Sequence, residues 1–224
     1  MLTAIFIDGG YVDKCANSDV DYAKLIETLA GDSRILQTYY YNGYPYDVSE
    51  QKKPDPKHIA FYEKKTKFFR SLESMPKFTC RYGYTVFRNG DFMQKGVDSL
   101  LVVDMLTLAA RKTVGSIKLL AGDRDFVAGV RAAREFGIIV DLFTFNEGTY
   151  AHMLRGECDS WNKLNANGSL STKKTKPAPA PEPSEPKAET TEETPKPKTS
   201  RSRRKKTSGN GKNGAEEKAK EPAT

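Results

Sequence analysis

The sequence predicts an α/β domain over residues 1–164, with a mainly parallel sheet covered by helices on both faces. Two observations support this prediction. Apolar runs of strand length alternate with segments of helical periodicity along the whole region. The first run, Leu2–Ile7, is apolar nearly throughout, which is typical of a central strand buried on both faces of a parallel sheet.

Strands and helices are expected to alternate along the domain. Gly31 is expected to end the first helix, and the prolines before His58 to begin the second. An Asn-Gly dipeptide after the third strand predicts a tight reversal. The expected strands are Leu2–Ile7, Arg34–Tyr41, Phe78–Phe87, Ser116–Ala121 and Ile138–Phe145, with an edge element at Cys158–Leu164. The expected helices are Asp21–Gly31, Pro54–Ser74, Val97–Arg111, Phe126–Phe136 and Gly148–Arg155.

Residues 165–224 are predicted to be a disordered tail rich in Pro, Lys and Glu. The tail has no aromatic residue and contains eight of the twelve prolines, so it has little apolar surface to offset the entropy of ordering. It carries 14 Lys or Arg against 8 Asp or Glu, which gives +6 of the net charge of +7. Its basic cluster, 201–206, is expected either to bind nucleic acid phosphates or to act only as a solubilising segment.

The cysteines and the apolar runs indicate the cellular compartment that is expected for the protein. Three cysteines without a CxxC spacing predict neither a disulfide framework nor a zinc site, and a reducing compartment fits them best. No apolar run approaches the roughly 20 residues of a spanning helix. A cytoplasmic protein without membrane contact is expected, and a homo-oligomer is left open.

Four aspartates lie where predicted strands end or predicted helices begin. Asp8 closes the first strand, Asp98 lies at the start of a helix, and Asp123 and Asp125 follow the strand that ends at Ala121. The carboxyl ends of neighbouring parallel strands share one rim of the sheet, where open α/β folds bind ligands. Close carboxylates raise one another's pKa, and a bound Mg²⁺ or Mn²⁺ ion resolves that repulsion. The pattern therefore predicts a metal-dependent phosphodiester hydrolase.

Each acid also has a structural interpretation. Asp8 precedes two glycines and can form a turn, whereas Asp123 can cap a helix by accepting a backbone hydrogen bond. Asp98 can likewise be a helix cap, and Asp125 can oppose a helix dipole in a first turn. Asp104 lies on a different helix face from Asp98, and it is expected to be a hydrogen-bonded structural acid, with support of a site residue as the alternative.

Cations and aromatic residues near these acids are candidates for substrate binding. Lys95 and Arg124 are next to the acids and are candidates to contact the scissile phosphate, although a solvated surface position is the alternative for both. Arg81 lies among tyrosines in and just after two predicted strands, and such aromatics can stack on unpaired bases. Packing within the sheet is the more common role of strand tyrosines. The two histidines are expected at the surface.

Three segments resemble motifs of the NYN domain, a PIN-like family that includes the LabA and DUF88 group. They are Phe6–Gly10, Lys95–Leu106 and Gly122–Phe126, and the resemblance extends over about residues 1–164. It implies a three-layer α/β/α fold and a ribonuclease activity that depends on Mg²⁺ or Mn²⁺. By motif match, the catalytic and metal-binding acids would be Asp8, Asp98, Asp123 and Asp125.

Two features depart from the family pattern. Gly10 and Tyr11 occupy places where many members have Asn, so a ligand or substrate contact of the family is expected to be missing. Tyr11 is a candidate substrate-binding residue beside Lys95, Arg124 and Arg81. PIN domains also carry an acid in an early helix, for which Glu63 is only a candidate.

The expected reaction is endonucleolytic cleavage of single-stranded or loop RNA by a metal-activated water, without a covalent protein intermediate. Asp8 and Asp123 would be central ligands, with Asp98 and Asp125 completing or orienting the site. The alternative is a nucleic-acid-binding or protein-interaction module of the same fold with weak or no catalysis. A phosphatase of the haloacid dehalogenase kind is disfavoured because Gly10 stands where its second Asp is needed.

Overall fold

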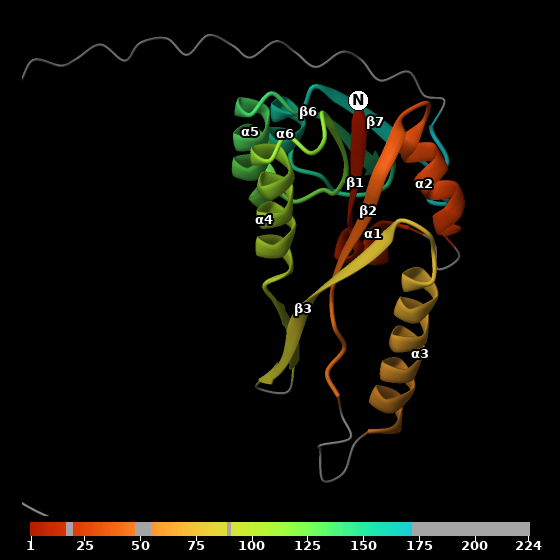
Figure 1. The fold of residues 1–224 in the computed structure, drawn as a ribbon. Coiled ribbons are helices and arrows are strands. Elements are labelled where there is room, and N and C mark those ends of the chain that lie inside the picture. Colours follow the sequence, from red (N-terminus) through yellow and green to blue (C-terminus); the bar gives the residue numbers. More distant parts are fainter. Residues whose placement is uncertain (17–19, 48–54, 89–90, 172–224) are drawn as a thin grey trace, which may run out of the picture. The chain divides into compact units, whose positions relative to one another are not determined.

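The computed structural model describes residues 1–16, 20–47, 55–88 and 91–171, which form an α/β domain on one seven-stranded sheet (Figure 1). The predicted Asn89-Gly90 reversal and the basic cluster 201–206 lie outside the described residues. Among the helices that are described, none has both the length and the apolar character needed to cross a bilayer.

The strand order in the sheet is β4-β3-β2-β1-β5-β6-β7. Every neighbouring pair is parallel except β3 and β4, which are antiparallel. The predicted fold class, a mainly parallel sheet between helices, is therefore confirmed. The strands are β1 (Leu2–Asp8), β2 (Arg34–Gly43), β3 (Phe78–Arg88), β4 (Asp91–Lys95), β5 (Ser116–Leu120), β6 (Ile139–Phe145) and β7 (Ser160–Leu164).

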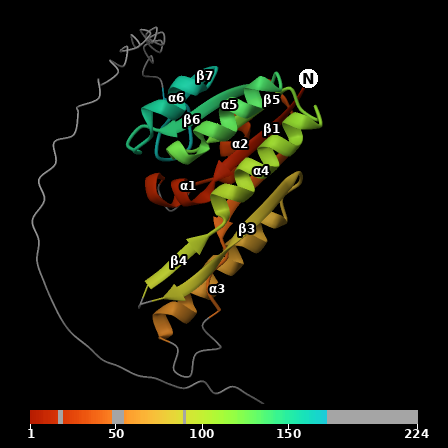
Figure 2. The same ribbon diagram turned by 90° about the vertical axis from the view of Figure 1, so that its left-hand side faces the viewer.

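Helices cover both faces of the sheet, because alternate residues of its strands point to opposite sides (Figures 1 and 2). Ala4 and Phe6 of β1 pack in a core with α4, α5 and α6, whereas Ile5 and Ile7 pack in a second core with α1, α2 and α3. The helical elements are α1 (Gly9–Cys15), α2 (Tyr22–Ala30), α3 (Pro56–Glu73), α4 (Val97–Ala110), the 3₁₀ turn η2 (Arg124–Phe126), α5 (Val127–Glu135) and α6 (His152–Glu157).

The strand order changes direction at β1, because the strands that follow it are added first on one side of β1 and later on the other. The chain passes from β1 to β2 and β3 on one side, and later from β5 to β6 and β7 on the other. The gap beyond the carboxyl ends of β1 and β5 is thus the topological switch point, where doubly wound sheets bind ligands.

Two elements, α1 and β4, are absent from the expected order. The Gly9-Gly10 pair indicated a turn, but α1 begins there directly after β1. Gly9 is required by a close approach, since a Cβ atom there would lie 2.4 Å from the Tyr40 ring and 2.7 Å from the Asn42 amide. Strand β4 is the return arm of the predicted reversal, pairing Tyr84 with Lys95.

Described structure also continues past the expected domain end at residue 164. Leu170 forms an antiparallel bridge with Leu164, and the Asn165 backbone N–H donates to the Ser169 carbonyl at 2.8 Å. These contacts place residues 165–171 against the edge strand β7.

Candidate acidic site at the carboxyl edge of the sheet

A pocket of about 670 Å³ lies at the switch point. Asp8 enters it from the end of β1, Asp98 from the first turn of α4 and Asp123 from the loop after β5. The expected gathering of acids at one rim of the sheet therefore occurs for these three residues. We call this cavity the acidic pocket. Its other lining residues are Gly10, Tyr11, Lys14, Cys15, Gln94, Gly96, Val97, Gly122, Arg124, Glu147, Thr149, Tyr150 and Ala151.

Asp8 is the N-cap of α1 as well as a lining residue. Its Oδ1 accepts a hydrogen bond from the Tyr11 backbone N–H at 3.1 Å. Burial raises the pKa of the Asp8 carboxyl to about 6, and repulsion from Asp98 adds to this shift. Backbone hydrogen bonds and the charge of Lys14 oppose it. Asp8 is thus held in a place where its ionised form is disfavoured.

Asp98 owes its position to Gly96. Gly96 joins β4 to α4 with φ at +79°, a left-handed conformation that glycine adopts without steric cost. This bend begins the helix at Val97 and brings Asp98 into its first turn. Partial burial raises the pKa of Asp98, and repulsion from Asp123 and Asp125 raises it further.

Asp123 and Asp125 follow β5 as expected, but their positions differ. Asp123 caps η2, because its Oδ1 accepts from the Asp125 backbone N–H at 3.0 Å. The Asp125 side chain is 67% exposed and does not line the pocket, with Oδ1 4.0 Å from the Arg124 Nε atom. Arg124 lines the pocket with a side chain that is 78% exposed. Asp125 therefore affects the pocket through the repulsion between its charge and the Asp98 carboxylate, which raises the pKa of Asp98.

Tyr11 shapes the wall of the pocket. Its ring is buried, and its hydroxyl accepts a hydrogen bond from the Phe145 backbone N–H at 3.1 Å. A Cβ atom at Gly122 would lie 2.5 Å from the Tyr11 ring, and one at Gly148 would lie 2.6 Å from its hydroxyl. Tyr11 thus fills the space that these glycines leave, which is a packing role for a residue considered as a substrate contact.

Two charged lining residues were missed by the sequence analysis. Lys14 of α1 faces the acids, and its charge lowers the pKa of both Asp8 and Asp98. Glu147 lines the pocket from the chain after β6. Glu147 follows the end of a strand and could have been found by the rule that located Asp123. Lys14 could not, because α1 was not predicted.

Two expected substrate contacts and one candidate acid lie outside the acidic pocket. Arg81 forms a two-pronged ion pair with Asp104, with Nε–Oδ2 2.9 Å and Nη2–Oδ1 3.1 Å. The Tyr41 hydroxyl also donates to Asp104 at 3.0 Å, which fits the structural role expected for this acid. Lys95 is exposed at the end of β4, and Glu63 is exposed on α3.

The donor chemistry of the pocket fits a hard divalent ion. Asp8, Asp98 and Asp123 offer carboxylate oxygens, and their mutual repulsion would be relieved by a bound cation. Among the residues that the structure describes, however, no three Asp, Glu, His or Cys side chains are gathered closely enough to form a complete ligand set. Ion binding would therefore require these side chains to move together.

The sheet order and the acidic pocket at the switch point define an open α/β domain of the PIN-like kind. The NYN domain family matches residues 2–165, and the chain belongs to this family. The expected resemblance is thus confirmed at the level of the NYN domain.

Two similar proteins add detail to this assignment. A 92-residue segment is 38% identical to the uncharacterized protein y4oD of Sinorhizobium fredii and covers 39% of this chain and 43% of that protein. The match thus spans less than half the length of that relative. A crystal structure of a protein of unknown function, VPA0982 from Vibrio parahaemolyticus, is similar with a TM-score of 0.52 and 18% identity. It covers 76% of this chain and 96% of that chain, and this likeness supports the fold alone.

Proposed function

We propose that this chain is an Mg²⁺- or Mn²⁺-dependent endoribonuclease that cleaves single-stranded or loop RNA at the acidic pocket. The observation that carries the proposal is the convergence of Asp8, Asp98 and Asp123 at the switch point, where burial and mutual repulsion raise the pKa of Asp8 and Asp98. Such perturbed carboxyl groups in a cleft are typical of functional sites. Membership of the NYN family supports the nuclease class.

The acids would hold the ion, with Asp8 and Asp123 as central ligands and Asp98 completing the set. A bound ion would supply an acidified attacking water and neutralise charge on the scissile phosphate. Asp125 would add negative charge from outside the pocket. The capping hydrogen bonds of Asp8 and Asp123 each occupy one carboxylate oxygen and fix the side chain at its helix start.

The cations of the pocket would bind the phosphate backbone. Lys14 faces the acids, and Arg124 lies on the exposed rim. Both would stabilise negative charge that develops on the phosphate during cleavage. Lys14 also partly neutralises Asp8 and Asp98 before substrate arrives. We expect Lys14→Ala to weaken cleavage about 10-fold or more, because one positioned charge is lost.

Cleavage of a labelled single-stranded RNA tests this proposal. With Mn²⁺ present, Asp98→Asn and Asp123→Asn should each lower the cleavage rate at least about 100-fold, a loss typical of removing a central group that stabilises a transition state. Asp21→Asn is the matched control, since Asp21 caps α2 at an exposed position. Cleavage that persists in chelator and in both variants would contradict the proposal.

A second candidate function is RNA binding without cleavage. It is favoured by the absence of a gathered ligand set among the described residues and by Gly10 at the family's Asn position. Under this function the wild-type chain would bind RNA equally with Mn²⁺ or chelator and would leave the strand intact.

The basic tail would add affinity for RNA in either case. Removal of residues 172–224 should weaken RNA binding and lower its dependence on salt concentration, because fewer counterions are released. A salt slope that stays unchanged would show that the tail makes no phosphate contacts.

A further inference from the structure

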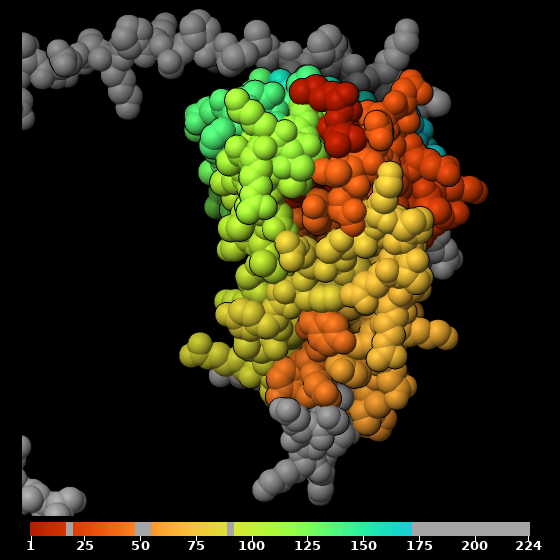
Figure 3. Space-filling view, viewed as in Figure 1, coloured from red at the N-terminus to blue at the C-terminus, as the bar shows by residue number. Residues whose placement is uncertain are grey.

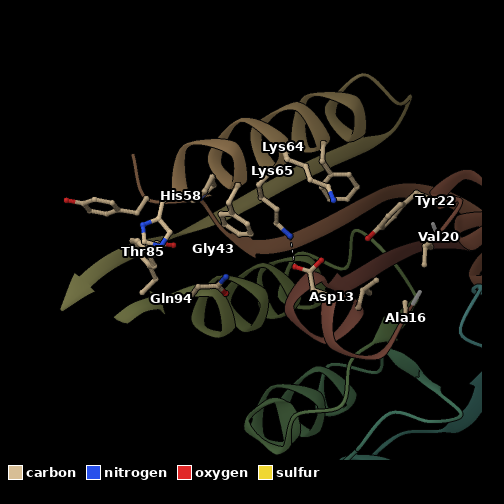
Figure 4. A pocket seen from close by; sticks show the side chains of 16 residues that line it. Asp13, Ala16, Val20, Tyr22, Gly43, His58, Lys64, Lys65, Thr85 and Gln94 are labelled. Carbon is tan, nitrogen blue, oxygen red and sulfur yellow. Dashed lines mark hydrogen bonds and ion pairs between the residues drawn. The ribbon is translucent and has the colours of Figure 1, made fainter. Parts of the chain in front are cut away.

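Figure 4 shows a second cavity, of about 900 Å³. It lies beside the acidic pocket, with which it shares the lining residue Gln94. It is bounded by α1 and the chain before α2, by the chain after β2, by α3 and by the β3–β4 hairpin. The space-filling view shows the chain after β2 emerging between β3 and α3 (Figure 3). We call this cavity the aromatic pocket, because six of its lining residues have aromatic rings: Tyr22, Tyr46, His58, Phe61, Phe68 and Phe92.

Several of these rings are open to solvent. Phe61 is 60% exposed and Phe92 is 39% exposed, although burial of either ring would be favourable. The His58 ring stands edge-on to Phe92 at 4.8 Å, and Tyr46 lies 5.8 Å from Phe92. Planar faces that are held in place and partly uncovered form a surface on which flat, unpaired bases can stack.

The charged residues of the aromatic pocket suit a polyanion. Lys64 and Lys65 line it from α3, and Figure 4 shows both side chains over the cavity. The acid on this wall, Asp13, already binds the Lys65 ammonium group and also accepts from the Asn42 side chain at 3.0 Å. Asp13 is therefore neutralised, whereas Lys64 is exposed and available to a phosphate group.

The aromatic pocket and the acidic pocket are neighbours that share one lining residue. Gln94 of β4 lines both of them, and its amide nitrogen lies 3.4 Å from the Asn42 Oδ1 atom. A strand whose phosphate lies among the acids can thus place a neighbouring nucleotide against the rings. Paired bases are stacked inside a duplex and cannot enter, so the geometry favours an unpaired nucleotide.

We propose that the aromatic pocket is a base-binding subsite, which takes an unpaired nucleobase next to the phosphate held at the acidic pocket. This inference rests on the proposed function for the placement of the phosphate. The binding of the base itself requires neither a metal ion nor cleavage. Phe61 and Phe92 stack on the base, and Lys64 binds the adjoining phosphate.

The first test measures the Kd of the full-length chain for a fluorescent ten-nucleotide single-stranded RNA in chelator, by fluorescence anisotropy. Phe61→Ala and Phe92→Ala should each weaken binding about 5- to 100-fold, the range expected when one base loses its stacking partner. Phe136→Ala is the matched control, because Phe136 is 49% exposed at the end of α5 and should leave the Kd unchanged. Phe61→Trp should restore or strengthen binding.

A second measurement separates base stacking from phosphate contact. Lys64→Ala should reduce the slope of log Kd against log salt by about 1, whereas Phe61→Ala should leave that slope unchanged. Lys67→Ala, on the exposed side of α3, is the control for charge. In a series of RNAs that each carry one abasic nucleotide at a different position, binding to the wild type should be weakened at one particular position. This position dependence should disappear in Phe61→Ala.

The outcomes distinguish this inference from the proposed function. Wild-type binding in chelator that is insensitive to Phe61→Ala, Phe92→Ala and abasic positions would overturn the base subsite, even if cleavage occurs. The base subsite would also be overturned if Phe61→Ala and Phe92→Ala weakened the binding of a duplex of the same sequence as much as they weaken the binding of the single strand. Position-dependent binding without any cleavage would support the subsite and contradict only the nuclease.

Discussion

The acidic pocket and the sheet both hold aspartates, but the charges of these residues have different surroundings in the two regions. In the sheet, Asp141 of β6 binds Lys118 of β5 with Nζ–Oδ2 2.6 Å, and both side chains are less than one-fifth exposed. In the acidic pocket, none of the described Lys or Arg nitrogens comes within 4.0 Å of Asp8, Asp98 or Asp123. The same residue type is thus neutralised in one region and left repelling its neighbours in the other.

This difference supports the proposed division between acids that serve the fold and acids that would serve a ligand. A carboxylate that serves the fold finds a partner, as Asp13, Asp104 and Asp141 do. Acids that repel one another cost stability and persist where an external cation or substrate gains from them. The comparison can be tested because the same substitution, Asp to Asn, should have opposite effects in the two regions.

The largest effect is expected in the sheet. Asp141→Asn should lower the free energy of unfolding by about 3 to 5 kcal/mol, since Lys118 would be left as a buried charge without its partner. The Ser160 hydroxyl would also lose its charged acceptor. Urea unfolding of the wild type and the variant measures this change. A loss smaller than that of an exposed substitution would remove the contrast between the regions.

Asp8→Asn should have the opposite sign in metal-free protein. The pKa of Asp8 is about 6 against an ordinary value of 3.8, so its ionised form destabilises the folded state above that range. Asn keeps the N-cap oxygen and removes the charge. We expect a gain on the order of 2 to 3 kcal/mol at pH 7, from about two units of raised pKa.

The pH dependence of this gain follows from the same shift. Because the folded state holds its proton more tightly than the unfolded state, wild-type stability should fall as pH rises from about 4 to about 6, relative to Asp8→Asn. Above pH 6 to 7 the difference should be constant. Unfolding in chelator across pH 4 to 8 measures it, and a gap that narrows as pH rises would contradict the raised pKa.

A bound ion should offset the loss of folding stability that the ionised acids cause in the acidic pocket. Mn²⁺ or Mg²⁺ at about ten times its Kd should stabilise the wild type by about 1.4 kcal/mol, because the ion binds only the folded state. Asp98→Asn should abolish most of this gain. Thermal unfolding with and without the ion tests the prediction, with the paired-acid variant Asp104→Asn as the comparison. Equal stabilisation of all three proteins would locate the ion elsewhere.

The smallest effect is expected for an exposed acid that neither repels nor pairs strongly. Asp21→Asn should change the free energy of unfolding by less than about 0.5 kcal/mol, because Asn and Asp are similar N-caps. The same unfolding measurements on this variant give the baseline against which Asp141→Asn and Asp8→Asn are compared. A change as large as that of Asp8→Asn would show that capping, and not burial of the charge, sets the Asp8 result.

Much of the fold could be predicted from local pattern. Apolar runs gave the strands and helical periodicity gave α2, α3, α4 and α5, with bounds within a few residues. The helix α1 was missed because two adjacent glycines have low helix propensity. Glycine is needed at position 9 because the backbone there passes close to Tyr40 and Asn42, which are more than 30 residues away in the sequence.

Part of the candidate site was also within reach of the sequence. Asp8 and Asp123 follow parallel strands, and the topology of such sheets brings strand ends to one rim. The ion-pair partners of the charged residues could not be predicted from the sequence. Arg81 binds Asp104 across 23 residues and Lys65 binds Asp13 across 52, so neither pairing leaves a local signal.

The sequence by itself determined the α/β class and the positions of Asp8 and Asp123 after their strands, because apolar and helical periodicity are local properties of the chain. Only the tertiary structure decided which acids are neutralised and that a pocket of aromatic rings adjoins the acids through Gln94. Ion pairs and cavities form between segments distant in sequence, and their energies depend on distances and burial that only the folded chain defines.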